Sequence, residues 1–87
     1  MSITNSQATV LITATKLFSA NGDRLSYSII NLSTGSIFIG KNDSVTITTG
    51  SELPTGSARN VAGDSEEVWA IAGSSLAISL VEQFRRL

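Results

Sequence analysis

The stretch LSYSI, residues 25–29, alternates apolar and hydroxyl-bearing side chains at every position. A period of two is typical of a β-strand with one buried face. The alternation shifts around Asn31, because Ile30 and Leu32 fall on the face opposite to Ile29. A strand with apolar groups on both faces fits the inside of a sandwich or a subunit contact better than a sheet with one solvated side.

The same period recurs in other short runs, which are separated by residues that favour turns. The runs cover residues 10–13, 37–39, 45–48, 68–72 and 76–80. Before residue 25, Asn21-Gly22-Asp23 contains Asn-Gly, the strongest short signal for a β-hairpin. Short strands with a turn about every 8–12 residues predict an all-β fold, a small antiparallel β-sandwich or barrel of about seven to eight short strands.

The 87 residues are enough for one domain. We expect a β-sandwich domain over residues 9–82, an N-terminal arm over residues 1–8 and a C-terminal tail over residues 83–87. The tail could be extended, disordered or a turn of helix, since Phe84 and Leu87 also fit a helical stripe. Trp69 lies within an alternating run, so we expect it in the core rather than as a stacking platform for a sugar.

The residue inventory argues against an enzyme. The chain has no His and no Cys, which removes the usual catalytic base, thiolate metal ligands and disulfides. The acidic stretch Asp64-Ser65-Glu66-Glu67 lacks the central glycine and alternating ligands of a calcium loop. We therefore expect no catalytic site, no metal and no cofactor.

Composition also limits the partners. Charged residues make up 15% of the chain, against about 25% in ordinary soluble domains, and the net charge of −1 argues against a nucleic-acid partner. No apolar run approaches the length of a membrane span and no signal peptide is visible, so we expect no membrane partner and synthesis in the cytoplasm. A small domain without disulfides or metal gains stability from association, which favours an oligomer or a subunit of an assembly.

Apolar residues near the two ends of the chain are candidate contacts with a partner. Ile3 lies in a polar N-terminal segment, and Phe84 and Leu87 flank the basic pair Arg85 and Arg86. Apolar groups in flexible segments often act as docking anchors that order on contact. The alternative is that they cover the domain's own edges.

Five motifs follow one another along residues 15–82. An Arg opens a strand that ends in Ile-x-Asn (Arg24–Asn31), and an apolar-x-Ile-Gly step follows (Ile37–Gly40). A Val-Thr strand (residues 45–48), a Leu-x-x-Gly turn (Leu53–Gly56) and the strand Val-Trp-Ala-Ile-Ala (Val68–Ala72) complete the set. In this order the motifs resemble a recurring small β-domain found in structural proteins of tailed-phage virions.

The resemblance implies a structural protein, most similar to a capsid decoration (cement) protein on the outer surface of a phage head. Its partners would be the major capsid protein and further copies of itself, as a homotrimer or less commonly a dimer. Its location would be the virion, at the capsid surface. The alternatives that the resemblance leaves open are a tail or neck adaptor and a receptor- or carbohydrate-binding module of a phage fibre.

Overall fold

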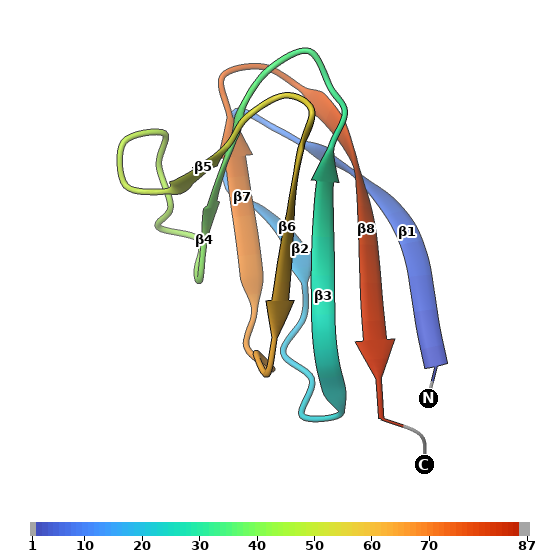
Figure 1. The fold of residues 1–87 in the computed structure, drawn as a ribbon. Helices are drawn as coiled ribbons and strands as arrows, with labels where there is room; N and C mark the ends of the chain where they lie inside the picture. Colours follow the sequence, from blue (N-terminus) through green and yellow to red (C-terminus); the bar gives the residue numbers. More distant parts are fainter. Residues whose placement is uncertain (1, 86–87) are drawn as a thin grey trace.

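A computed structural model describes residues 2–85 and contains eight β-strands in two antiparallel sheets (Figure 1). The predicted all-β sandwich is therefore confirmed. In chain order the strands are β1 (Ser2–Val10), β2 (Thr15–Phe18), β3 (Arg24–Asn31), β4 (Ile37–Gly40), β5 (Ser51–Leu53), β6 (Ser57–Ala62), β7 (Val68–Ala72) and β8 (Leu76–Phe84).

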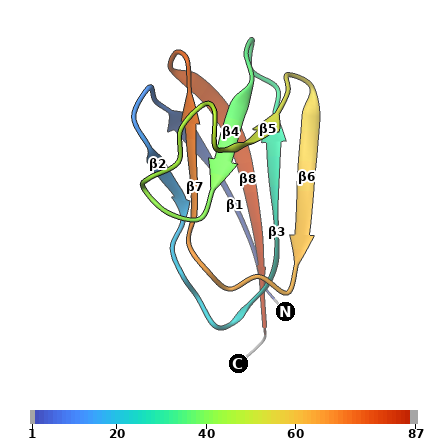
Figure 2. The same ribbon diagram turned by 90° about the vertical axis from the view of Figure 1, so that its left-hand side faces the viewer.

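The two sheets have the orders β1-β8-β3-β6 (sheet A) and β2-β7-β4-β5 (sheet B). The first strand pairs with the last, the second with the seventh, the third with the sixth and the fourth with the fifth. The chain thus runs as one long antiparallel hairpin folded across two sheets, which is the jelly-roll arrangement. The turned view shows the two layers facing each other (Figure 2).

The core lies between the sheets and follows the alternation along the central strands. Tyr27 and Ile29 of β3 point inward and are almost fully buried, as the 25–29 pattern predicts. Leu25 departs from the pattern and is exposed, because the pairing of β3 with β8 shifts between Arg24 and Ser26. The other core side chains are Val10, Phe18, Ile37, Ile39, Leu53, Val68, Ala70, Ala72, Leu76, Ile78 and Leu80.

Buried Arg24 connects the two sheets at one end of the sandwich. Its Nε donates to the carbonyl of Asp64 at 3.0 Å and its Nη1 to the carbonyl of Ser19 at 3.0 Å. Nη1 also lies 3.2 Å from a carboxylate oxygen of Glu82, and Nη2 donates to the carbonyl of Glu66. The guanidinium therefore joins the end of β2, the β6–β7 loop and β8, which come from both sheets.

Fully buried Asn31 does the same at the other end of β3. Its Nδ2 donates to the carbonyl of Leu53 in sheet B at 2.8 Å and to that of Gly35 at 2.9 Å. Its Oδ1 accepts the backbone N–H of Ser33 at 3.1 Å. With these contacts every buried polar atom of both side chains has a partner, as a dry interior requires.

The structure differs from the sequence expectations in several connections. The predicted hairpin at Asn21-Gly22 is wrong, because β2 and β3 lie in different sheets and the turn crosses between them. The predicted strand at residues 45–48 is also wrong, since Thr46 Oγ1 and its carbonyl hold a local turn. The run at residues 10–13 ends as a strand at Val10, and β5 and β6 were not anticipated.

The segments near both ends of the chain are also part of the sandwich. Residues 2–10, expected within and beside an arm, form β1 and pair with β8 in unbroken register from Ser2↔Phe84 to Val10↔Leu76. β8 continues past the expected boundary at residue 82, to Phe84. β1 forms although most of its side chains are polar, because its backbone N–H and C=O groups pair with those of β8.

The first prediction concerns Arg24. Arg24→Leu leaves three carbonyls and the Glu82 carboxylate without their donor, so the free energy of unfolding should fall by about 3 kcal/mol. Urea unfolding followed by the fluorescence of Trp69, the single Trp, measures the change. Glu82→Gln keeps an acceptor and should lose about 1 kcal/mol, whereas exposed Arg85→Leu should stay within about 0.5 kcal/mol. Equal losses for Arg24→Leu and Arg85→Leu would contradict the role given to Arg24.

Candidate interaction surface

The outward face of sheet A carries no charged side chain among the residues that the structure describes. The register places outward side chains in three rows that run across the strands of sheet A. Ser26, Ser28 and Ile30 of β3 are each paired with one residue of β8 and one of β6. The same β8 residues face β1. We call this surface the neutral face; its residues are Ile3, Asn5, Gln7, Thr9, Ala77, Ser79, Val81, Gln83, Ser26, Ser28, Ile30, Ala58, Asn60 and Ala62.

The neutral face is broad and slightly hollow. With strands about 4.8 Å apart and a rise of about 3.3 Å per residue, it spans roughly 400 Å² in projection. A shallow depression of about 380 Å³ lies at its middle, with Asn5, Gln7, Ile30, Ser79 and Val81 among its lining residues. Hydroxyl, amide and small apolar groups can be desolvated against a partner without removing the hydration of an ion.

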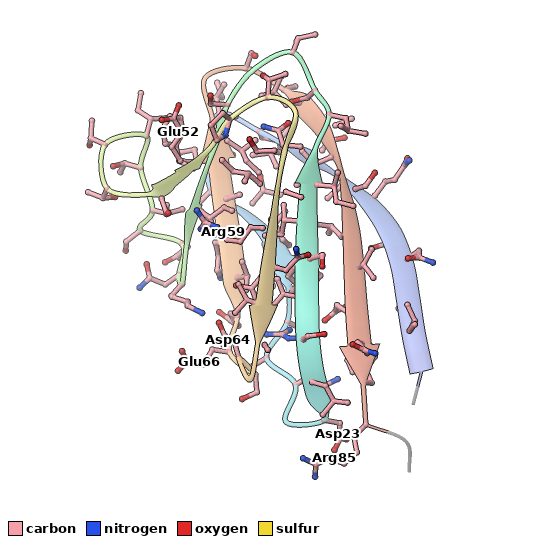
Figure 3. The ribbon with its side chains drawn as sticks, in the orientation of Figure 1. Asp23, Glu52, Arg59, Asp64, Glu66 and Arg85 are labelled. Atoms are coloured by element: carbon pink, nitrogen blue, oxygen red, sulfur yellow. The ribbon has the colours of Figure 1, made fainter. Side chains whose placement is uncertain are left out.

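Charged residues lie elsewhere on the molecule. Those labelled in Figure 3 lie beside β5 and β6 or at the end of the sandwich made by the β2–β3 and β6–β7 loops. Arg59 of β6 points inward, where its Nη2 donates to Ser51 Oγ of β5 at 2.7 Å. The charges therefore border sheet B and one end, and they leave the neutral face clear.

The outward face of sheet B is different, because a loop covers part of it. Val45, in the loop between β4 and β5, is only 7% exposed and lies outside the core between the sheets. A Cβ built on Gly40 or Gly50 would lie less than 3 Å from the Val45 side chain. The close approach that these glycines permit holds the loop against the sheet, so this face is less open than the neutral face.

Trp69 lies on this covered side, so its predicted place in the core is wrong. It alternates with buried Val68 and Ala70 and is half-buried on the outward face of β7. Its Nε1 donates to Glu67 Oε1 at 3.1 Å, and Lys16 Nζ lies 5.5 Å from the ring centre. Lys16 also pairs with Glu67 at 3.3 Å, and these partners hold the pKa of the Glu67 carboxyl below its usual value.

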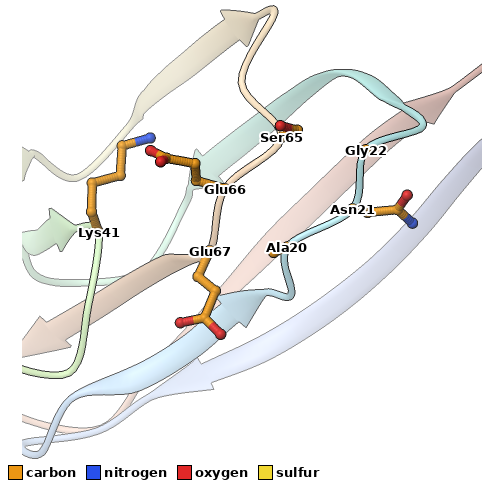
Figure 4. Close-up of a pocket in the computed structure, with 7 residues that line it drawn as sticks. All are labelled: Ala20, Asn21, Gly22, Lys41, Ser65, Glu66 and Glu67. Atoms are coloured by element: carbon orange, nitrogen blue, oxygen red, sulfur yellow. The ribbon is translucent and has the colours of Figure 1, made fainter.

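A charged depression of about 610 Å³ opens at the end of the sandwich near the β2–β3 and β6–β7 loops (Figure 4). The Glu66 and Glu67 carboxylates on its wall point in different directions, and Lys41 pairs with Asp64. Within residues 2–85 no group of three His, Cys, Asp or Glu side chains could hold a metal ion. Of the charged groups that line the depression, Lys41 pairs with Asp64 and Glu67 with Lys16, and the depression offers no converging set of reactive groups among the described residues.

The predicted contact residues are partly brought together. Ile3 of β1 is 59% exposed on the neutral face, beside Gln83. Phe84 pairs with Ser2, one position along, and is half-buried on the opposite side of the sheet. Arg85 is exposed and its backbone N–H donates to the carbonyl of Asp23 at 2.7 Å. Arg86 and Leu87 lie outside the described residues.

Sequence reasoning missed most of the neutral face. Ser, Asn, Gln and Ala side chains carry no chemical signal one by one, and only the register shows that they share a face. Four further apolar side chains are exposed at loops and were not singled out: Leu11, Ile12, Leu32 and Ile47.

Comparison of the chain with protein-family models, with curated proteins and with solved structures finds no match. No helix in the part of the chain that the structure describes is long and apolar enough to cross a membrane.

The packing of the β4–β5 loop gives a second prediction. Gly50→Ala places a Cβ 2.7 Å from the Cβ of Phe38, so the loop must shift and the free energy of unfolding should fall by about 1–3 kcal/mol. Gly22→Ala is the matched control, because a Cβ there meets nothing within 4 Å, and its effect should stay within about 0.5 kcal/mol. Equal urea midpoints for the two variants would show that the loop does not press on sheet B.

A third prediction is that the ion pair of Asp64 with Lys41 stabilises the protein at neutral pH and less so in acid. The hydrogen bond from Lys41 lowers the pKa of the Asp64 carboxyl, with a smaller contribution from the Glu66 backbone N–H. A lowered folded-state pKa stabilises the protein above the unfolded value of 3.8, and that stability is lost as the pH falls through the folded value.

Asp64→Asn keeps the acceptor for the Glu66 N–H but removes the charge. It should therefore lower the urea midpoint at pH 7 and lower it less at pH 2, because the stabilisation by the charged carboxylate is lost as the pH falls through the folded-state pKa. Asp43→Asn is the control, since Asp43 forms no ion pair within residues 2–85. An Asp64→Asn effect that is the same at both pH values would exclude the ion pair as its cause.

Proposed function

We propose that the chain is a structural virion protein, an oligomeric capsid decoration (cement) protein that binds the outer surface of a phage head and stabilises it. The observation that carries the proposal is the neutral face. A decoration protein needs a compact module with a surface that is inexpensive to desolvate against the shell, and the four-stranded outward side of sheet A meets that need.

The size of the neutral face fits a repeated contact better than a single tight one. Roughly 400 Å² in projection is less than the about 800 Å² that each partner buries in a standard stable interface. On a shell that repeats its binding site, several linked copies gain affinity through effective concentration, so modest contacts suffice. The partners proposed are the major capsid protein and further copies of this chain.

Two other observations support this function. The motif order along residues 15–82 resembles small β-domains of phage virions. The jelly-roll strand order is an architecture shared by viral capsid and lectin domains, although a fold alone does not fix a function.

Location on the particle is the direct test of this function. Gold-labelled antibody against the protein, applied to intact particles of the phage that encodes it, should label the head when viewed by negative-stain electron microscopy. Label confined to the tail or neck would instead favour an adaptor. Particles that carry the protein by mass spectrometry but show no label at their surface would exclude decoration.

The neutral face gives a fourth prediction. Asn60→Lys introduces a charge at an exposed position of β6 on this face, so binding to heads that lack the protein should weaken at least about tenfold, since a buried unpaired charge costs more than 1.4 kcal/mol. Ser74→Lys, in the exposed β7–β8 loop, is the control and should bind as the unmodified protein does. Co-sedimentation with heads measures both, and equal binding would rule out this face.

A second candidate, a carbohydrate- or receptor-binding module, is favoured by the position of Trp69 on the surface of sheet B rather than in the core. A glycan array tests it. A sugar bound by the unmodified protein and lost in Trp69→Ala, with the urea midpoint retained, would support this function over decoration.

A further inference from the structure

Strand β1 forms a long open edge of sheet A. It spans nine residues, from Ser2 to Val10, and pairs only with β8. Figure 1 shows it as the outermost strand of its sheet. Within residues 2–85, no turn or loop hydrogen bond uses a backbone group of β1. The N–H and C=O groups on its outer side are therefore a template for another strand.

The other three edges are protected in ways that β1 is not. β2 is four residues long and its pairing shifts between Lys16 and Phe18. β5 is only three residues long. β6 carries the inward-pointing Arg59, which bonds across to Ser51. Short length, irregular register and inward charges are the devices that keep edges from pairing. β1, with the sequence SITNSQATV and a regular register, has none of them.

We propose that β1 pairs antiparallel with β1 of a second copy about a two-fold axis, joining two A sheets into one eight-stranded sheet. A two-fold axis sets residues of one strand opposite residues of the same strand. Like charges directly opposite would destabilise such a pair, and β1 has no charge. Its Ser, Thr, Asn and Gln side chains suit hydrogen bonding across the pair instead.

The paired edge also extends the proposed binding surface. Because the outward sides of the two A sheets become continuous, the neutral face doubles to roughly 800 Å² in projection, the size of one side of a standard interface. The biological use of the dimer therefore rests on the proposed function, although the pairing itself does not need a capsid. It favours a dimer over the trimer that the resemblance implies.

Single cysteines test the pairing cleanly, because the chain has no Cys of its own. In an antiparallel pair, opposite residues have Cα atoms about 4.5–5.5 Å apart, within reach of a disulfide. One cysteine is placed at each position from 3 to 9 in turn, and Asn60→Cys on the opposite edge strand is the control. Under mild oxidation at about 100 μM protein, we expect at least one β1 position to form a linked dimer tenfold or more faster than Asn60→Cys.

Sedimentation velocity of the protein without cysteines gives the second measurement. It should show a monomer–dimer equilibrium, which Ser6→Lys shifts toward monomer at least tenfold and Ser74→Lys does not. The Ser6 side chain is exposed on the side of β1 opposite to the neutral face, so Ser6→Lys leaves that face unaltered. A trimer, a monomer at every concentration, or cross-linking at Asn60→Cys as fast as in β1 would overturn the pairing. Head labelling then still tests the proposed function on its own.

Discussion

The guanidinium of Arg24 lies in the interior, so each of its N–H donors that faces away from water needs an acceptor. Its acceptors come from the end of β2, the β6–β7 loop and β8. Phe18 and Tyr27 close the remaining space, with their ring centres 5.4 and 5.3 Å from the guanidinium carbon. This one group therefore fixes the position of sheet A relative to sheet B. Burial raises the pKa of the neighbouring Tyr27 hydroxyl. Asn31 makes the matching connection at the other end of β3, so the central strand is held at both ends.

With the sheets fixed in this way, the register decides which residues face out. The inward side of β3 takes Tyr27, Ile29 and both polar anchors, which leaves Ser26, Ser28 and Ile30 for the outside. The partners of these three on β8 and β6 are also uncharged. Arg59 and Glu82, the charged residues of sheet A's flanking strands, face inward and are held by contacts there. The described charged side chains thus lie inside, at the ends of the sandwich and along sheet B, and the outward side of sheet A stays neutral.

The sequence indicated the β-sandwich and much of its core, because Tyr27, Ile29, Ile37, Val68 and Leu80 follow a clear period of two. It could not indicate β1, where polar side chains outnumber apolar ones, or β6, where the two kinds are equal in number. Only pairing with β8 and β3 makes these segments strands. Residues 45–48 alternate equally well, yet the Thr46 hydroxyl bonds the backbone of Thr48 and Thr49 and turns the chain. Asn-Gly at residues 21–22 gives a turn as expected. Whether the strand after the turn joins the same sheet or the other one depends on contacts between residues far apart in the sequence, such as Arg24 with Glu82. Of the candidate contacts, Ile3 was placed on the neutral face by register alone.

A cryo-electron microscopy reconstruction of the proposed phage particle, at a resolution that separates strands, is the most direct test of the proposal that the neutral face binds a capsid. It should place the domain on the outside of the head with β1, β8, β3 and β6 turned toward the capsid subunits and sheet B with its covering loop turned toward solvent. A domain seated on the head through sheet B, or found only in the tail, would contradict the role given to the neutral face.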